Sequence, residues 1–247
     1  TKAFSLPNGT LLGCTFNCEL VRQLYEMTGL ELRLNRVDTL LGPGLNIHRN
    51  PLNGRNFEYI SEDPFLTGKM GAAQLQGLNI AGSTGTIKHF AANNQETKRH
   101  EADSIISVRA LREIYLKGFE IAVREAQPLS IMTSYNLLNG IHTANSHDLI
   151  QGMARDEWGF KGVVMTDWFT SQDMPMITGK FKPAYPISAS TGCIYAGNDI
   201  QMPGCQKNVD DIVEAVKTGK EIDGYKITKA DLQFNAANVI RVAARTM

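Results

Sequence analysis

The sequence predicts an α/β protein of the incomplete (β/α)8 TIM-barrel type. Apolar runs recur along the chain, and each is followed by a loop and then by apolar residues at helical spacing. Runs that are apolar throughout are typical of parallel strands covered by helices on both faces. Polar residues end four of these runs, at residues 46–49, 88–89, 134–136 and 167–168. The carboxyl ends of barrel strands meet at one mouth, where active sites lie, so these residues favour a barrel.

A Rossmann-type sheet is the alternative fold for such a pattern. That fold needs a glycine-rich turn directly after a strand, with an acidic residue further along the chain. Residues 42–44 (GPG) lack both the third glycine and an acidic residue in register. We therefore favour the barrel.

The strand predictions follow the apolar runs in chain order. They cover residues 9–15, 37–47, 85–91, 129–135, 162–168 and 193–202. Each run is short and rich in β-branched or aliphatic residues. The chain therefore carries about six β/α units, whereas a closed barrel has eight. Either two strands are cryptic, or part of the barrel is missing from this chain.

The helix predictions rest on apolar residues at helical spacing and on residues that start helices. They cover residues 20–27, 63–78, 108–123, 146–158, 209–217 and 229–244. Pro64 occupies a favoured first-turn position, and Thr228 with Asp231 forms a capping box before the last helix. Residues 170–191 show no clear periodicity, and we predict an irregular loop there, over the mouth of the barrel.

Composition and charge exclude several classes of protein. The 247 residues are 43% hydrophobic, and 25 Lys and Arg balance 25 Asp and Glu. A chain of this length can bury a sizeable core, and its neutral balance gives no electrostatic reason to expect nucleic acid as a partner. No apolar run approaches the roughly 18 residues that a membrane helix needs. We expect neither a nucleic-acid partner nor a membrane partner.

The cysteine and histidine spacings give no signature of a metal site or a disulfide. The four cysteines lack the zinc-ribbon spacing, and the five histidines include no HxH or HxxxH pair. We therefore expect free thiols and no bound metal. The chain also lacks P-loop and GxSxG patterns, which argues against nucleotide hydrolysis and α/β-hydrolase chemistry.

Asp167 is the strongest catalytic candidate. It ends an apolar strand and directly precedes a large aromatic residue, Trp168. A carboxylate in such a place is partly desolvated, which suits a nucleophile or a general base. The plainer interpretation is an aspartate that caps the next helix or loop.

Lys88, His89 and Arg55 are candidates for binding a ligand. Lys88 and His89 end a strand, where the plainer interpretations are a barrel-mouth ion pair and a hydrogen-bonded core histidine. Arg55 lies in a long polar loop after a strand, where an arginine can hold hydroxyl groups or a carboxylate. It can equally pin that loop by pairing with Glu58, Glu62 or Asp63.

Four segments resemble the β-glucosidase type of the family 3 glycoside hydrolases. They are residues 41–64 (LGPGLNIHRNPLNGRNFEYISEDP), 88–96 (KHFAANNQE), 131–136 (IMTSYN) and 158–168 (WGFKGVVMTDW). They follow one another in the order and spacing of that family, and residues 4–14 and 196–203 fit more loosely. One motif alone is weak, but four in sequence are highly specific. The resemblance predicts a single catalytic barrel domain over residues 1–247.

The resemblance implies a retaining exo-glycosidase that releases terminal β-D-glucose from β-glucosides or short β-glucans. It assigns the nucleophile, which forms a covalent glycosyl-aspartate intermediate, to Asp167. It assigns the pocket for the terminal sugar to Arg55, Lys88, His89, Tyr135 and Trp168. A retaining glycosidase also needs a second carboxyl group, about 5 Å from the nucleophile, to protonate the leaving oxygen. No cofactor is implied.

The chain departs from the family pattern in two places. The Asp-Gly-Pro segment that opens the family's barrel has no match before Leu41. The family's acid/base glutamate comes from an α/β sandwich domain, for which this chain has no room. We therefore expect a fragment of a larger multidomain enzyme that relies on another segment for the acid. Glu58, Glu96 and Glu101 are conceivable acids within the chain, and we expect them to be structural.

Other functions stay open at this point. A β-xylosidase or an exo-glucanase of the same family differs only in the shape of the pocket. A non-catalytic sugar-binding barrel would keep the pocket without turnover, and a small-molecule lyase on the same fold is a third class. The sequence sets neither the compartment nor the oligomeric state, so a secreted, periplasmic or cytoplasmic protein and a homo-oligomer are all compatible with it.

Overall fold

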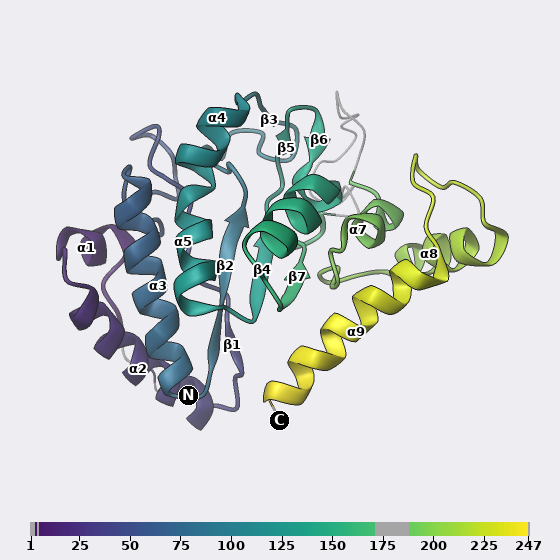
Figure 1. The fold of residues 1–247 in the computed structure, drawn as a ribbon. Coiled ribbons are helices and arrows are strands. Elements are labelled where there is room, and N and C mark those ends of the chain that lie inside the picture. Colours follow the sequence, from purple (N-terminus) through teal and green to yellow (C-terminus); the bar gives the residue numbers. More distant parts are fainter. Residues whose placement is uncertain (1–2, 4, 171–187, 247) are drawn as a thin grey trace.

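A parallel sheet is the centre of the fold. The computed structural model describes residue 3, residues 5–170 and residues 188–246. The sheet contains β1 (Thr39–Leu40), β2 (Thr84–Phe90), β4 (Ser130–Thr133) and β7 (Val163–Met165), which lie in that order and pair in parallel (Figure 1). The predicted α/β class with parallel strands is therefore confirmed.

Within the described residues this sheet does not close on itself. β1 pairs with β2 alone, and beyond β7 the sheet continues only through a parallel bridge between Met165 and Ile200. The strands lie in the sheet in the same order as in the chain, as successive β/α units of a barrel do. The structure is thus an open, barrel-like sheet, in agreement with the predicted incomplete barrel.

Three helices pack beside β1 and β2. α2 (Cys18–Leu34), α3 (Pro64–Ile80) and α5 (Lys117–Ala126) lie next to one another, with α3 in the middle (Figure 1). Because it has neighbours on several sides, α3 buries most of its residues, including Met70 and Leu75. These helices supply most of the core on that face of the sheet.

The start of α3 shows why the helix begins where the sequence predicts. The Asp63 carboxylate accepts a hydrogen bond from the Leu66 amide at 2.6 Å, and Pro64 occupies the first helical position. A carboxylate there satisfies an amide that has no partner inside the helix, and proline has the backbone angle that the first turn needs. The helix predicted from residue 63 is confirmed.

The helix predicted over residues 108–123 is interrupted. α4 (Val108–Ala110) continues into a π-helical stretch, Leu111–Tyr115, before α5 begins. The wider π turn shifts the phase of the helix, so that Leu116 is buried whereas Val108 is exposed. A helix is correctly predicted here, and most of its predicted apolar face, including Leu111, Phe119 and Val123, is buried, but the helix is not a continuous α-helix. The helix predicted over residues 146–158 is likewise π-helical, at Asp148–Glu157.

Two strand predictions are wrong. Residues 9–15 form a helix, α1 (Gly9–Cys14), because the Asn8 side chain caps it by accepting the Leu11 amide at 2.9 Å. Residues 193–202 begin inside a second helix, α7 (Ser190–Ala196), which ends at Gly197 in the left-handed conformation. Capping by a side chain thus explains the first helix, whereas no side chain caps the start of α7, and in the second segment Ile200 still pairs with Met165 through a parallel bridge. Of the loop predicted at 170–191, residues 171–187 lie outside the described residues, and Ser190 and Thr191 are helical.

A small second sheet lies at the carboxyl end of the parallel strands (Figure 1). It consists of β3 (Asp103–Ser104), β5 (Leu137–Leu138) and β6 (Ile141–His142), in that order. Asn139 and Gly140, both with positive φ, connect β5 to the antiparallel β6. An Asn-Gly pair favours this two-residue turn because both residues tolerate positive φ. The second sheet thus covers one side of the barrel mouth.

The C-terminal part of the chain adds α8 (Gln206–Thr218) and α9 (Lys229–Thr246). The predicted capping box at the start of α9 is confirmed, since Asp231 accepts the Thr228 amide at 2.7 Å and Thr228 accepts the Asp231 amide at 3.3 Å. α9 runs diagonally past the sheet, close to α7 (Figure 1). The four cysteines, all within the described residues, are free thiols, as predicted. None of the helices in the described part of the chain is long and apolar enough to cross a membrane.

Candidate active site

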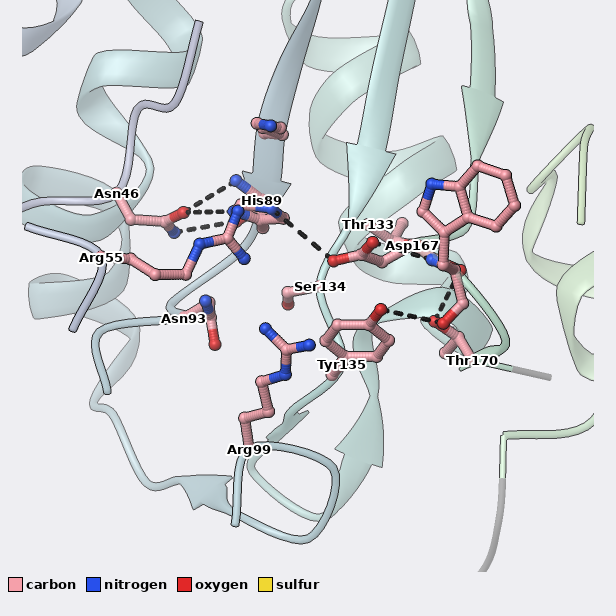
Figure 2. Close-up of polar contacts among 12 residues, drawn as sticks. Asn46, Arg55, His89, Asn93, Arg99, Thr133, Ser134, Tyr135, Asp167 and Thr170 are labelled. Carbon is pink, nitrogen blue, oxygen red and sulfur yellow. Dashed lines mark hydrogen bonds and ion pairs between the residues drawn. The ribbon is translucent and has the colours of Figure 1, made fainter. Parts of the chain in front are cut away.

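Asp167 stands at the carboxyl end of β7, where the strand gives way to a loop. Its side chain is 9% exposed. One carboxylate oxygen accepts the Trp168 amide at 2.7 Å, and the other lies 3.6 Å from Nε2 of His89 (Figure 2). The carboxylate therefore bonds to the backbone on one side and faces the end of β2 on the other.

Two opposing effects set the pKa of Asp167. Burial raises this pKa above its ordinary value, because a carboxylate loses hydration there. The Trp168 amide and the neighbouring Arg55, Tyr135 and Arg99 favour the ionised form and limit the rise. The result is a desolvated carboxylate supported by donors, which is the environment that a nucleophile requires.

His89, at the end of β2, is buried and held on two sides. The Asn46 side chain accepts the His89 amide at 2.7 Å and donates to the His89 carbonyl at 2.8 Å, and Nδ1 of His89 lies 3.1 Å from the Tyr59 hydroxyl. Burial, followed by nearby cations such as Arg55, lowers the pKa of His89 well below its ordinary value. The ring is therefore neutral, with Nε2 facing Asp167. Figure 2 shows Asn46 and Arg55 on one side of His89 and Asp167 on the other.

Arg55 and Lys88 converge on one carboxylate, Glu58. Nη2 of Arg55 lies 2.7 Å from one oxygen of Glu58, and Nζ of Lys88 lies 2.7 Å from the other. Burial opposes ionisation of Glu58, but these two cations outweigh it and lower the pKa of Glu58. Glu58 is thus ionised and cannot act as a general acid. The pairing of Arg55 with Glu58, considered above as the plainer interpretation, is present.

Tyr135 follows β4 and contacts the backbone next to Asp167. Its hydroxyl donates to the Trp168 carbonyl at 2.8 Å. Its ring contacts two side chains of the loop after β2, with the Arg99 guanidinium 4.4 Å and the His100 ring centre 4.1 Å from its own centre. Trp168 itself is 47% exposed, so its indole offers an open face beside Asp167.

The structure brings all six predicted site residues together at the carboxyl ends of β2, β4 and β7 and in the loop after β1. The predicted residues are Arg55, Lys88, His89, Tyr135, Asp167 and Trp168. Arg99, Asn46 and Tyr59 were missed. Asn46 lies in a polar segment after a predicted strand, which is a usable signal, but the spacing of Arg99 and Tyr59 gives none. Both reach the site through the fold of their loops.

A cavity of about 510 Å³ lies beside β1 and extends to the edge of this site. Glu58 lines it, together with the buried Gln74 of α3 and the backbone of residues 40–44, whereas Asp167 does not. The polar cluster around Asp167 is therefore separate from this cavity. Among the described residues, no group of three or more His, Cys, Asp or Glu side chains is placed to hold a metal ion.

Comparison with known proteins identifies the family. Residues 2–242 match the model described as "Glycosyl hydrolase family 3 N terminal domain". The chain is 51% identical over 243 residues to a β-glucosidase of Ruminococcus albus, covering 97% of this chain and 24% of that protein. It is 40% identical over 231 residues to an exo-α-(1→6)-L-arabinopyranosidase of Bifidobacterium longum, covering 91% of this chain and 30% of that protein.

The solved structures agree with this result. β-Glucosidase 3B of Thermotoga neapolitana in complex with glucose is similar at a TM-score of 0.86 and 40% identity, over 98% of this chain and 32% of that one. The chain thus spans about a quarter to a third of the length of these relatives. Since the family model matches almost the whole chain, this protein belongs to glycosyl hydrolase family 3 and carries the family's TIM-barrel-like N-terminal domain.

Proposed function

We propose that the protein carrying this chain is a retaining exo-glycosidase that releases terminal β-D-glucose from β-glucosides or short β-glucans. The observation that carries the proposal is a buried carboxylate, Asp167, facing a neutral histidine and two cations at a barrel mouth. The names of the relatives support it, since one is a β-glucosidase and another was solved with glucose.

In the proposed mechanism Asp167 attacks the anomeric carbon of the terminal sugar. A bond forms between its carboxylate oxygen and that carbon while the bond to the leaving oxygen breaks, and a second carboxyl group gives the leaving oxygen a proton. Water then hydrolyses the glycosyl ester, which restores Asp167 and retains the anomeric configuration. The Trp168 amide, which already donates to Asp167, helps to hold the carboxylate in one orientation.

Arg55, Lys88 and His89 bind the hydroxyl groups of the terminal sugar in this proposal. Each is mostly buried and carries N–H groups, and hydrogen bonds from charged donors are stronger than those from neutral ones. The exposed face of Trp168 forms a wall of the pocket, and Tyr135 fixes the Trp168 backbone. An uncharged sugar is bound by directed hydrogen-bond donors and brings no negative charge of its own. The single charge of Glu58 already balances one of the two cations, Arg55 and Lys88.

The general acid comes from outside this chain in our proposal. Glu58 and Glu96, which lie near the site, are both paired with cations, Glu96 with Arg99 at 2.7 Å. We propose that residues 1–247 form a single catalytic barrel domain and that another segment of the enzyme, an α/β sandwich, brings the acid/base glutamate. The relatives support this arrangement, because they extend well beyond the region matched here.

A fluorinated substrate tests the nucleophile. A 2-deoxy-2-fluoro-β-glucoside slows hydrolysis of the covalent intermediate, so the labelled residue can be identified by peptide mass spectrometry. We expect the label on Asp167 and none in Asp167→Asn. A stable adduct on any other residue contradicts the assignment. Appreciable turnover of aryl glucosides by the isolated 247-residue chain would show that the acid lies inside it.

For the identity of the sugar, a relative suggests a specific alternative to glucose. The similarity to an arabinopyranosidase favours a pentopyranoside as the second candidate substrate, and β-xylosidase and exo-glucanase activities belong to the same group of alternatives. A panel of nitrophenyl glycosides separates them. We expect the highest kcat/KM for the β-glucoside, and a clear preference for a pentoside would overturn the glucose assignment.

A further inference from the structure

Glu58 joins the two cations that we propose to bind the sugar. Its oxygens lie 2.7 Å from Nζ of Lys88 and 2.7 Å from Nη2 of Arg55, and Nε of Arg55 donates to the latter oxygen at 2.8 Å. The three side chains are 14–22% exposed. Over the described part of the chain, neither cation has a second carboxylate within ion-pair distance. The placement of both cations therefore depends on one side chain.

The backbone at Glu58 is held by a tight turn and by close packing. The Glu58 amide donates to the Arg55 carbonyl at 3.0 Å, which closes a tight turn. Two glycines allow neighbouring backbone to approach: a Cβ on Gly9 would overlap the Glu58 carbonyl, and one on Gly44 would lie 3.3 Å from its Cγ. The close packing of the Glu58 backbone thus limits the positions that its carboxylate can reach.

The charges around the site explain what this arrangement does. Glu58 faces Arg55, Lys88 and the Tyr59 phenol, while Asp167 faces His89, Tyr135, Arg55 and Arg99. Without Glu58, two partly buried cations would repel each other, and Asp167 and Glu96 would be the nearby carboxylates that attract Arg55, of which Glu96 is already paired with Arg99. A nucleophile engaged in a close ion pair is a weaker nucleophile, and an Arg55 side chain drawn to Asp167 would leave the position from which it can donate to a hydroxyl group.

We propose that Glu58 is a positioning residue for the sugar site, which holds Arg55 and Lys88 as a fixed pair of donors and keeps Arg55 from pairing with Asp167. This inference rests on the proposed function, because it assumes that the two cations bind a sugar. Glu58 does not touch the reacting atoms and acts only through Arg55 and Lys88.

Two substitutions separate the charge of Glu58 from its geometry. Glu58→Gln keeps the size of the side chain and removes its charge, whereas Glu58→Asp keeps the charge and shortens the reach. The matched control is Glu157→Gln, which removes the same charge from a surface pair with Arg112. All variants are made in the whole encoded protein, and thermal unfolding checks that each is folded. Glu58→Asp keeps the test decisive if Glu58→Gln fails to fold.

Two measurements are made on each variant. Calorimetry gives the affinity for glucose. The rate of labelling by 2,4-dinitrophenyl 2-deoxy-2-fluoro-β-glucoside is then followed as a function of pH. In that reaction a bond forms from Asp167 to the anomeric carbon, and dinitrophenolate departs with the electron pair. Because this phenolate leaves without protonation, the rate reports the nucleophile and the sugar pocket and does not depend on the general acid.

We expect Glu58→Gln to bind glucose about tenfold more weakly, because its charge-assisted hydrogen bonds no longer hold both donors. The acid limb of its labelling profile moves to lower pH by about one unit, since a negative charge is lost near Asp167 and two cations become uncompensated. Glu58→Asp keeps the wild-type acid limb but binds glucose more weakly. Glu157→Gln behaves as wild type in both measurements.

The outcomes distinguish this inference from the proposed function. If Glu58→Gln retains both the wild-type affinity and the wild-type acid limb, Glu58 is merely structural and the inference fails, while the glycosidase assignment stands. If the wild type takes no label but Glu58→Gln loses glucose affinity, the inference stands and the glycosidase assignment fails. A wild type that neither binds glucose nor takes the label overturns both.

Discussion

Two buried ion-pair clusters in this molecule differ in what they leave unsatisfied. At the barrel mouth, Glu58 shares its two oxygens between Arg55 and Lys88, so cationic donors outnumber the carboxylate. Beside β7, Asp199 pairs with Arg155 at 2.8 Å, and those two side chains are 0% and 8% exposed. The first cluster carries an excess of cationic donors at the proposed sugar site, whereas in the second one carboxylate is paired with one guanidinium, of which only Nε lacks a hydrogen-bond partner.

The cluster around Asp199 connects a helix to the parallel sheet. Besides Arg155, the Asp199 carboxylate accepts the Val164 amide at 2.7 Å and the Asn238 side chain at 2.9 Å. Those partners come from β7 and α9, so one aspartate links a helix to the sheet. A saturated buried carboxylate has no bond left for a ligand, and this is the physical difference between a structural ion pair and a binding site.

The largest expected effect is on stability at the Asp199 cluster. Asp199→Ala leaves the Arg155 guanidinium buried without its counter-charge and releases α9, so the free energy of unfolding should fall by about 3–5 kcal/mol. Urea denaturation measures the loss, with Asp199→Asn as a milder control whose single amide oxygen can still accept the Val164 amide but no longer also accepts the Asn238 side chain. A loss no larger than that of a surface substitution would contradict a structural role.

The pH dependence of stability gives the next effect. Burial, opposed mainly by Arg155, raises the pKa of Asp199 from 3.8 to about 6. Between these values the folded state holds a proton that the unfolded state has released, so the free energy of unfolding falls as the pH rises from about 4 to about 6. At about 1.4 kcal/mol per pKa unit, the contribution of Asp199 is roughly 3 kcal/mol.

Asp199→Asn isolates this contribution from that of the other carboxylates. As the pH rises from about 4 to about 6, the wild type should lose stability through Asp199, whereas the variant should not. The unfolding free energy of the variant should therefore increase relative to that of the wild type. Urea denaturation at pH 4, 5 and 6 measures it. Parallel pH profiles for the two proteins would show that Asp199 titrates at an ordinary pKa.

At the Glu58 cluster we expect a smaller effect on stability. The Glu58, Arg55 and Lys88 side chains keep 14–22% exposure, so water partly solvates each charge after its partner is lost. Glu58→Gln should reduce the free energy of unfolding by about 1 kcal/mol, well below the effect of Asp199→Ala, although it weakens sugar binding. If Glu58→Gln destabilises the protein as much as Asp199→Ala does, the proposed difference between the two clusters is wrong.

The smallest effect is expected at the surface. Arg112 and Glu157 form an ion pair at 2.6 Å, but their side chains are 45% and 43% exposed. Exposed pairs contribute little because water and salt screen them. Glu157→Gln should leave the melting temperature within experimental error at physiological ionic strength. A measurable decrease would show that this pair does more than the exposed geometry predicts.

Much of the site could be predicted because its chemistry is local in the chain. Asp167 and the Lys88–His89 pair directly follow apolar runs, and the carboxyl ends of parallel strands converge. The roles that join distant segments could not be predicted. Arg99 reaches Tyr135 by the fold of a loop, and no spacing in the sequence indicates that Glu58 contacts both Arg55 and Lys88.

α9 shows the limit of periodicity most clearly. A helix is correctly predicted there, but its buried residues include Asn235 and Asn238, while Phe234 and Ile240 are exposed. The two asparagines are buried because Asn235 donates to the Ile194 carbonyl and Asn238 to Asp199. A pattern rule assigns buried positions by hydrophobicity, and it fails where specific polar partners hold the helix in place.

The sequence by itself determined the α/β class, the incomplete barrel, the family resemblance and the candidate residues, because strand propensity, apolar runs and motif order are properties of neighbouring residues. The tertiary structure alone decided that residues 9–15 are helical and that the helix after residue 108 contains a π turn. It also decided which charges meet, since contacts between distant segments depend on how strands and loops pack. Those contacts distinguish Arg55 and Lys88, which share one carboxylate at the proposed sugar site, from Arg155, which is neutralised by Asp199 in the core.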